Sequence, residues 1–193
     1  MNRTLMAVGA HADDLELNVG GTLLKYRERG YQVVYVMSTN NMAGAWTRGK
    51  PDGAFEVTLP PYYELMPQRK LEAAAGAKVL GTVPIHLDHP QRLFVRADGT
   101  RSELRYGSDR PDRVVPTDVP TILTAHEDKR AVQRLADLIL EHKPEAILTH
   151  GPAQGDMEHI GTALLVTRSY QQAVAAGHDG MLLMWRDGTT FWG

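Results

Sequence analysis

Strand-like and helix-like segments alternate along this chain of 193 residues, and this alternation restricts its fold more than any other feature. Short runs of apolar and β-branched residues predict five strands, at residues 4–9, 32–38, 83–87, 145–150 and 181–185. Helical spacing of apolar residues predicts helices at 18–29, 67–80 and 159–176, and another that opens after Thr124 in a capping box with Glu127. The alternation predicts an α/β domain with a mostly parallel sheet and helices on both faces.

Two stretches interrupt this alternation. Residues 40–66 contain several glycines and the Pro60-Pro61 pair, which predict a loop. Within residues 88–121, "RLFVRADGTRSELRY" at 92–106 predicts an inserted β-hairpin that turns at Asp98-Gly99. Three interpretations of this hairpin are open: a surface excursion, a flap over a site, or a dimer arm. We favour the surface excursion.

Composition narrows the class of protein. Hydrophobic residues make up 42% of the chain, which suits a single domain over residues 1–193. The absence of cysteine excludes disulfides, thiolate zinc sites and a cysteine nucleophile. A net charge of −2 argues against nucleic acid or an anionic membrane as partner. With neither a signal peptide nor a membrane-spanning run in the sequence, we expect a cytoplasmic protein, and a homo-oligomer is left open.

Histidines and acids concentrate in two turns that follow predicted strands. Ligands of parallel α/β sheets bind beyond the carboxyl ends of the strands, which singles out residues 9–16 and 149–159. The first turn holds His11, Asp13 and Asp14, and the second holds His159. Imidazole and carboxylate suit Zn²⁺ and also Mn²⁺ or Fe²⁺, and a catalytic zinc site takes three protein ligands and leaves one position for water. We therefore expect a metal site shared by the two turns.

One carboxylate of the Asp13-Asp14 pair would remain for proton transfer. A metal lowers the pKa of the water that it binds, and a neighbouring carboxylate can accept the proton. These parts suit hydrolysis of an amide or ester without a covalent intermediate. The alternatives are that the acids cap a helix and that His11 is a half-buried histidine with local hydrogen bonds.

Three motifs carry a resemblance to a known family. "AHADDLELNVGGT" at 10–22 resembles the signature of the LmbE-like, or PIG-L, family of metal-dependent N-deacetylases. "RKLEAAAGAKVLG" at 69–81 and "DMEH" at 156–159 resemble the family's second and third conserved stretches in order and spacing. The resemblance spans residues 4–176 and implies a Rossmann-like α/β fold.

The resemblance also implies roles for single residues. It implies three metal ligands, usually for zinc: His11, Asp14 and His159. Asp13 would be the general base that activates water and then protonates the leaving amine. Glu16 matches the glutamate of the first motif, Arg69 matches a substrate-side arginine, and Glu158 would orient a ring nitrogen of a ligand.

The chain departs from the family pattern at several positions. Ala12 replaces the usual proline of the first motif. Asp156 occupies the first histidine position of the "DMEH" motif. Two interpretations are open for His150 and His89: one of them substitutes for that histidine, or each is a loop histidine with local hydrogen bonds. We expect the Gly20-Gly21 pair to allow close helix packing.

The sequence leaves three alternative functions. The first is a zinc-dependent N-deacetylase that removes an acyl group, typically acetyl, from an N-acylated amino sugar or a sugar-bearing small metabolite. Trp46 would then be a wall of the sugar pocket. The second is a metal-dependent amidase on a non-sugar substrate, and the third is a catalytically weak metal- or carbohydrate-binding domain. A dinucleotide-binding protein is disfavoured because no G-x-G-x-x-G is present.

Overall fold

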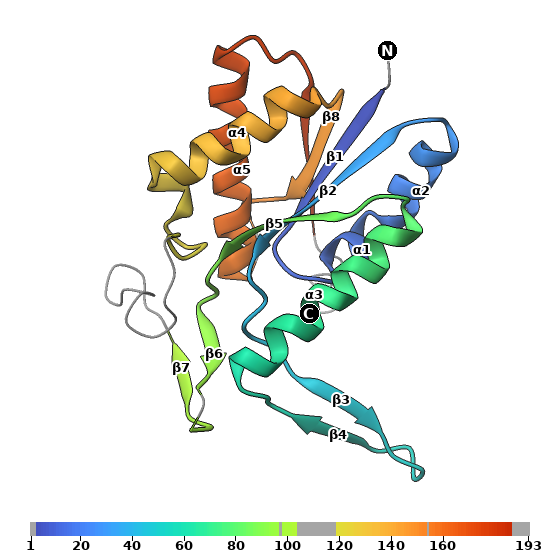
Figure 1. Cartoon of the computed structure of the whole chain (residues 1–193), viewed down its shortest axis with the longest axis vertical. Coiled ribbons are helices and arrows are strands. Elements are labelled where there is room, and N and C mark those ends of the chain that lie inside the picture. The colour runs from blue at the N-terminus through green and yellow to red at the C-terminus, as the bar shows by residue number, and fades with distance from the viewer. Residues whose placement is uncertain (1–2, 97, 104–118, 154, 187–193) are drawn as a thin grey trace.

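The computed structural model describes residues 3–96, 98–103, 119–153 and 155–186. Within them a five-stranded sheet forms the centre of the domain, in the order β5-β2-β1-β8-β9 (Figure 1). Its strands are β1 (Thr4–Gly9), β2 (Gln32–Thr39), β5 (Pro84–His89), β8 (Ala146–His150) and β9 (Met181–Trp185). Every neighbouring pair is parallel. The predicted α/β fold class and all five predicted strands are confirmed.

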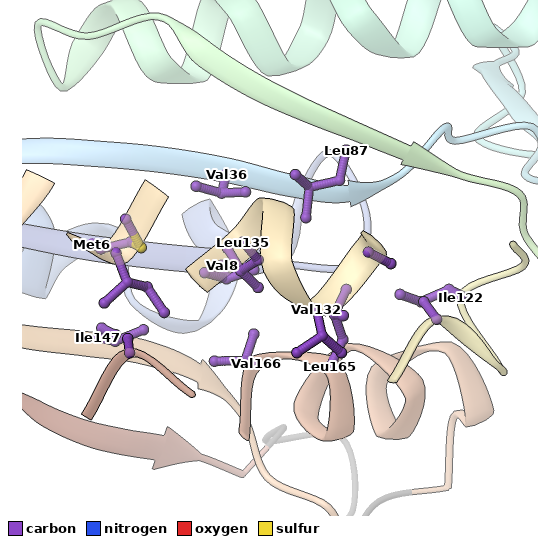
Figure 2. Packing of buried hydrophobic residues seen from close by; sticks show 14 of the residues in the cluster. Met6, Val8, Val36, Leu87, Ile122, Val132, Leu135, Ile147, Leu165 and Val166 are labelled. Atoms are coloured by element: carbon purple, nitrogen blue, oxygen red, sulfur yellow. The ribbon is translucent and has the colours of Figure 1, made fainter. Parts of the chain in front are cut away.

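Helices cover both faces of the sheet. They are α1 (Asp14–Asn18), α2 (Gly20–Glu28), α3 (Tyr62–Val79), α4 (Lys129–His142) and α5 (Met157–Ala175). Side chains alternate along β1, so that Met6 and Val8 join the core under α4 and α5 (Figure 2). Leu5 and Ala7 join a second core beneath α1, α2 and α3. β1 is therefore buried on both faces, which explains why it is apolar throughout.

The predicted loop at 40–66 is wrong in two respects. Residues 46–58 form an antiparallel ribbon of β3 (Trp46–Gly49) and β4 (Phe55–Thr58). In addition, α3 begins at Tyr62 and continues through Pro67. Each ribbon strand has four residues, all of them exposed. Because neither strand has a buried face, its sequence need not alternate between apolar and polar residues, which is the pattern that predicts a strand.

The predicted hairpin is confirmed where the structure describes it. β6 (Leu93–Val95) pairs with β7 (Arg101–Glu103) in antiparallel register. Asp98 Oδ1 accepts hydrogen bonds from the Thr100 amide and hydroxyl, and Gly99 has φ +81°. Residues 104–106 of the expected hairpin lie outside the described residues.

The expected cap at Thr124 is wrong. A short 3₁₀ turn, η2 (Ala125–Glu127), comes first, and α4 begins after it. Asp128 is the N-cap, and its side chain accepts hydrogen bonds from the amides of Arg130 and Ala131. Thr124 makes no side-chain cap hydrogen bond, and aspartate is the stronger of the two residue types at an N-cap.

No helix in the described part of the chain combines the length and the apolar character that a bilayer crossing requires.

Two helical glycines have opposite surroundings and give a matched prediction. A Cβ on Gly161 of α5 would lie 2.5 Å from the backbone oxygen of Ile122, whereas a Cβ on Gly21 would meet no atom within 4 Å. Gly161→Ala should therefore lower the free energy of unfolding by about 1–3 kcal/mol, through overpacking against the backbone. Gly21→Ala should raise it by roughly 0.5–1 kcal/mol, because alanine favours a helix.

Urea unfolding followed by circular dichroism measures both effects. A Gly161→Ala protein as stable as the wild type would contradict the assigned packing of α5 on Ile122. The open space around Gly21 also corrects the expectation that the Gly20-Gly21 pair serves close packing.

Candidate metal centre

The candidate site lies where the sheet order reverses direction. β1 is flanked by β2, the next sheet strand along the chain, and by β8, which follows more than 100 residues later. Such a switch point opens a crevice at the carboxyl ends of the two strands. The turn after β1 carries His11, Asp13 and Asp14, and the segment after β8 leads into α5, which carries His159. The two turns indicated by the sequence therefore meet.

Three side chains converge at this crevice. His11 Nδ1 lies 3.2 Å from His159 Nε2, and His159 Nε2 lies 3.3 Å from Asp14 Oδ1. One ligand atom from each of the three residues falls within 4.8 Å of the others. Two imidazole nitrogens and a carboxylate oxygen form a donor set suited to Zn²⁺. The residues present therefore fit a divalent cation, and we refer to His11, Asp14 and His159 as the metal group.

Glu158 supports the metal group from the opposite side of the His11 ring. Its Oε2 lies 2.7 Å from His11 Nε2, and the same oxygen accepts a hydrogen bond from Gln91 Nε2. Its Oε1 accepts from the amide of Arg92 at 2.6 Å. A carboxylate on Nε2 keeps a proton there, so Nδ1 is the ring nitrogen that would bind a cation in place of its own proton. Glu158 thus contacts the ring of His11 across the crevice, and its expected orienting role stays a prediction. Gln91 was not predicted.

The charges of this buried cluster compensate one another. Burial lowers the pKa of His11, but hydrogen bonds to Asp14 and Glu158 outweigh burial and raise the pKa to about 10. Burial raises the pKa of Asp14, but hydrogen bonds from three histidines outweigh it and hold the pKa well below its usual range. Asp14 is thus ionised in a buried position, and the protonated His11 beside it supplies the counter-charge.

His150 stands behind the metal group. It is fully buried, and its ring stacks on that of His159 with centroids 4.0 Å apart. Its Nε2 lies 3.2 Å from Asp14 Oδ2 and 3.1 Å from the Ala10 amide. His89, the other candidate to replace the missing histidine, has Nδ1 2.9 Å from the Pro120 carbonyl. Of the two, the structure brings His150 to the site.

Asp13 lies beside the metal group and contributes no atom to it. Its side chain is 49% exposed, and Oδ2 accepts a hydrogen bond from Arg69 Nη2 at 3.2 Å. Arg69 Nη1 donates to Glu72 at 2.6 Å, so the guanidinium is held by two carboxylates. The Asp13 carboxylate is thus partly open to solvent, and its expected role as general base stays a prediction.

The family model described as PIG-L, GlcNAc-PI de-N-acetylase, matches residues 6–170. The chain belongs to the PIG-L family. The resemblance drawn from the three motifs is confirmed, and the match includes all three members of the metal group.

Two curated relatives are described by the same activity. A 1D-myo-inositol 2-acetamido-2-deoxy-α-D-glucopyranoside deacetylase from Kineococcus radiotolerans is 27% identical over 188 residues, which cover 92% of this chain and 47% of that protein. The deacetylase of the same description from Mycobacterium leprae is 28% identical over 177 residues, or 90% of this chain and 52% of that protein. The chain thus spans about half the length of these relatives.

Solved structures share the PIG-L fold at lower identity. The N,N′-diacetylchitobiose deacetylase from Pyrococcus horikoshii superposes with a TM-score of 0.58 at 18% identity, over 94% of this chain and 60% of that one. The 4-carboxy-2-hydroxymuconate hydratase from Pseudomonas putida gives a TM-score of 0.60 at 21% identity, over 92% and 60%. The same fold therefore serves more than one reaction, and function must be argued from the site.

Two further motif residues of this PIG-L chain lie outside the metal group. Glu16 Oε1 accepts a hydrogen bond from the Tyr35 hydroxyl at 2.8 Å. Asp156 caps α5, because its side chain accepts hydrogen bonds from the amides of Glu158 and His159. The expected start of this helix at residue 159 is corrected to Met157, and the cap fixes the turn that presents His159.

Asn41 was missed at the sequence level, although it holds the turn that carries His11. It is buried, and its backbone has φ +55°. Its Oδ1 accepts a hydrogen bond from the Ala12 amide at 2.8 Å. The Thr39 hydroxyl donates to the neighbouring Ala10 carbonyl at 2.6 Å, so Thr39, the last residue of β2, holds the same turn as Asn41. A proline at position 12 has no amide proton to make the first of these bonds.

Asn41→Gly should weaken metal binding by about ten-fold, because glycine keeps the positive φ and removes the acceptor for Ala12. Asn41→Asp keeps an acceptor oxygen at the same position and should recover most of the affinity. Titration of metal-free protein with Zn²⁺ against a chromophoric chelator measures both variants. Equal affinities for the two variants would rule out the hydrogen bond as the cause.

Proposed function

We propose that this chain is a metal-dependent N-deacetylase, with zinc as the metal and Fe²⁺ or Mn²⁺ as alternatives. Its substrate would be an N-acylated amino sugar or a sugar-bearing small metabolite. The observation that carries the proposal is the convergence of His11, Asp14 and His159 beside the exposed carboxylate of Asp13. The described activity of the curated PIG-L relatives supports an acetylated amino sugar as substrate.

Some residues of the site would hold the metal, and others would take part in the reaction. The metal would be held by His11 Nδ1, a carboxylate oxygen of Asp14 and His159 Nε2. When bound, it would polarise the acyl carbonyl and acidify a water molecule. Glu158 keeps the proton of His11 on Nε2 throughout.

Asp13 moves the proton. It accepts a proton from the attacking water and returns it to the amide nitrogen as the C–N bond breaks. The products are a carboxylate, acetate in the simplest case, and a free amine, so that one water is consumed for each amide. Arg69 orients the Asp13 carboxylate by donating to Oδ2, which leaves Oδ1 for the water.

The test combines metal analysis with measured amine release. Purified protein, loaded with Zn²⁺, is offered N-acetylglucosamine, the acetylated inositol glycoside of the relatives and an N-acetyl amino acid. We expect amine from the sugars and loss of turnover after chelation. Release from the amino acid alone would favour the amidase alternative, and sugar binding without any release would favour the binding domain. Cytoplasmic location and homo-oligomer formation stay predictions.

A further inference from the structure

Gln91 is a buried polar residue that none of the proposed catalytic steps uses. It lies between β5 and β6, and only 2% of its surface is exposed. Both ends of its side-chain amide are hydrogen-bonded. Oε1 accepts from the Ala43 amide at 2.8 Å, and Nε2 donates to Glu158 Oε2 at 2.7 Å. A buried amide that is bonded at both ends holds its two partners in a fixed relation.

The chemistry of the two partners determines which way this amide points. A backbone amide can only donate, so Ala43 requires the oxygen of Gln91. An ionised carboxylate can only accept, so Glu158 requires the nitrogen. A carboxylate at position 91 would lack the donor, and an ammonium group there would lack the acceptor. The position therefore calls for an amide side chain.

Glu158 is the partner through which Gln91 reaches the metal group. The Oε2 atom of Glu158 accepts from Gln91 and also lies 2.7 Å from His11 Nε2. Its Oε1 accepts from the Arg92 amide at 2.6 Å. Burial raises the pKa of Glu158, but its hydrogen bonds, including the one from Gln91, outweigh burial and lower the pKa. Of these three partners, Gln91 alone is a side chain outside the metal group, so it can be replaced without removing a proposed ligand.

Ala43 connects Gln91 to the segment between β2 and β3. Asn41, two residues earlier in this segment, accepts a hydrogen bond from the Ala12 amide in the turn that carries His11. The segment thus reaches His11 by two routes. One leads through Ala12 to the backbone of His11, and the other leads through Gln91 and the carboxylate to its ring.

We propose that Gln91 is a positioning residue of the metal group. By fixing the Glu158 carboxylate, it holds the His11 ring so that Nδ1 faces His159 Nε2, 3.2 Å away. Without this amide the carboxylate can turn about its side-chain bonds, and the ring bonded to it turns as well. Gln91 acts through Glu158 rather than on the cation. This inference rests on the metal site of the proposed function and adds a residue that sets the affinity of that site.

A double-mutant cycle on zinc affinity tests this assignment. Gln91→Met keeps the length of the side chain but removes its donor and its acceptor. We expect it to weaken Zn²⁺ binding by about ten-fold in the wild type, and by less than about two-fold in protein that also carries Glu158→Ala, where the carboxylate is absent. The control, Tyr170→Phe, removes a hydrogen bond to the Gly180 carbonyl and should leave zinc affinity unchanged. Wild-type affinity in Gln91→Met, or an equal loss with and without Glu158, would overturn the proposal.

A second measurement does not depend on metal binding. In metal-free protein labelled with nitrogen-15, NMR follows the proton between His11 Nε2 and the Glu158 carboxylate. We expect this proton to exchange with water about ten-fold faster in Gln91→Met and at the wild-type rate in Tyr170→Phe, because the loss of a distant hydrogen bond does not open this one selectively. If the protein binds no zinc, the metal site of the proposed function fails, while proton exchange still decides the role of Gln91. An unchanged exchange rate in Gln91→Met would exclude that role.

Discussion

Asp13→Asn should lower kcat for amine release by about 10²–10⁴-fold while its affinity for Zn²⁺ stays close to that of the wild type. The reason is the separation seen in the site: Asp13 contacts Arg69, and the metal group consists of other residues. Asparagine keeps an oxygen for Arg69 but cannot take a proton from water. Stopped assays of amine release and a zinc competition titration measure the two quantities on the same preparation.

Asp137→Asn is the control for this experiment, because Asp137 lies on α4 and is hydrogen-bonded to Gln133. It should change neither quantity. If Asp13→Asn lost zinc along with activity, Asp13 would be a ligand and the base would have to be sought elsewhere. Full activity in Asp13→Asn would exclude it as the base.

His159→Ala should weaken Zn²⁺ binding by more than about 100-fold, because it removes one of three direct donors. Glu158→Gln should have an intermediate effect of about 10–100-fold, the usual range for a residue that orients a ligand. Glutamine retains the size of Glu158 but loses the charge that raises the pKa of His11. Competition with a chromophoric chelator gives the affinities, and mass spectrometry of the native protein gives the stoichiometry.

The decisive result is the order of the zinc affinities, which should fall from the wild type to Glu158→Gln and again to His159→Ala. His142→Ala, in the last turn of α4, serves as the control and should bind Zn²⁺ as the wild type does. Wild-type zinc affinity in His159→Ala would refute the metal group, because no cation site of this geometry tolerates the loss of a donor without cost. A larger effect from Glu158→Gln than from His159→Ala would make Glu158 a ligand.

The sequence was sufficient for the framework and for the location of the site. Parallel strands buried on both faces, such as residues 4–9, are runs of apolar residues that can be recognised locally. Because ligands of such sheets bind beyond the carboxyl ends of the strands, the strand assignments then indicated two turns. His11 and His159 could be paired before any coordinates because β1 and β8 both end at the same edge of the sheet.

The supporting residues could not be found in this way. Asn41 and Gln91 act through single hydrogen bonds to Ala12 and Glu158, and no periodicity marks a polar residue that makes one long-range bond. The β3–β4 ribbon was not predicted for a related reason, since all the residues of its two strands are exposed. The helix start was placed at Thr124 in place of Asp128 because both residue types cap helices and no sequence pattern marks the short 3₁₀ turn between them.

The contact between His11 and His159 joins segments 148 residues apart along the chain. A cation bound between them would link the two segments reversibly across the middle of the sheet. It would do so only in the folded protein, where the two histidines lie side by side. Metal uptake and folding would therefore be thermodynamically coupled, and the midpoint of thermal denaturation should rise with the free zinc concentration. Scarcity of metal would then cost the cell intact protein as well as turnover.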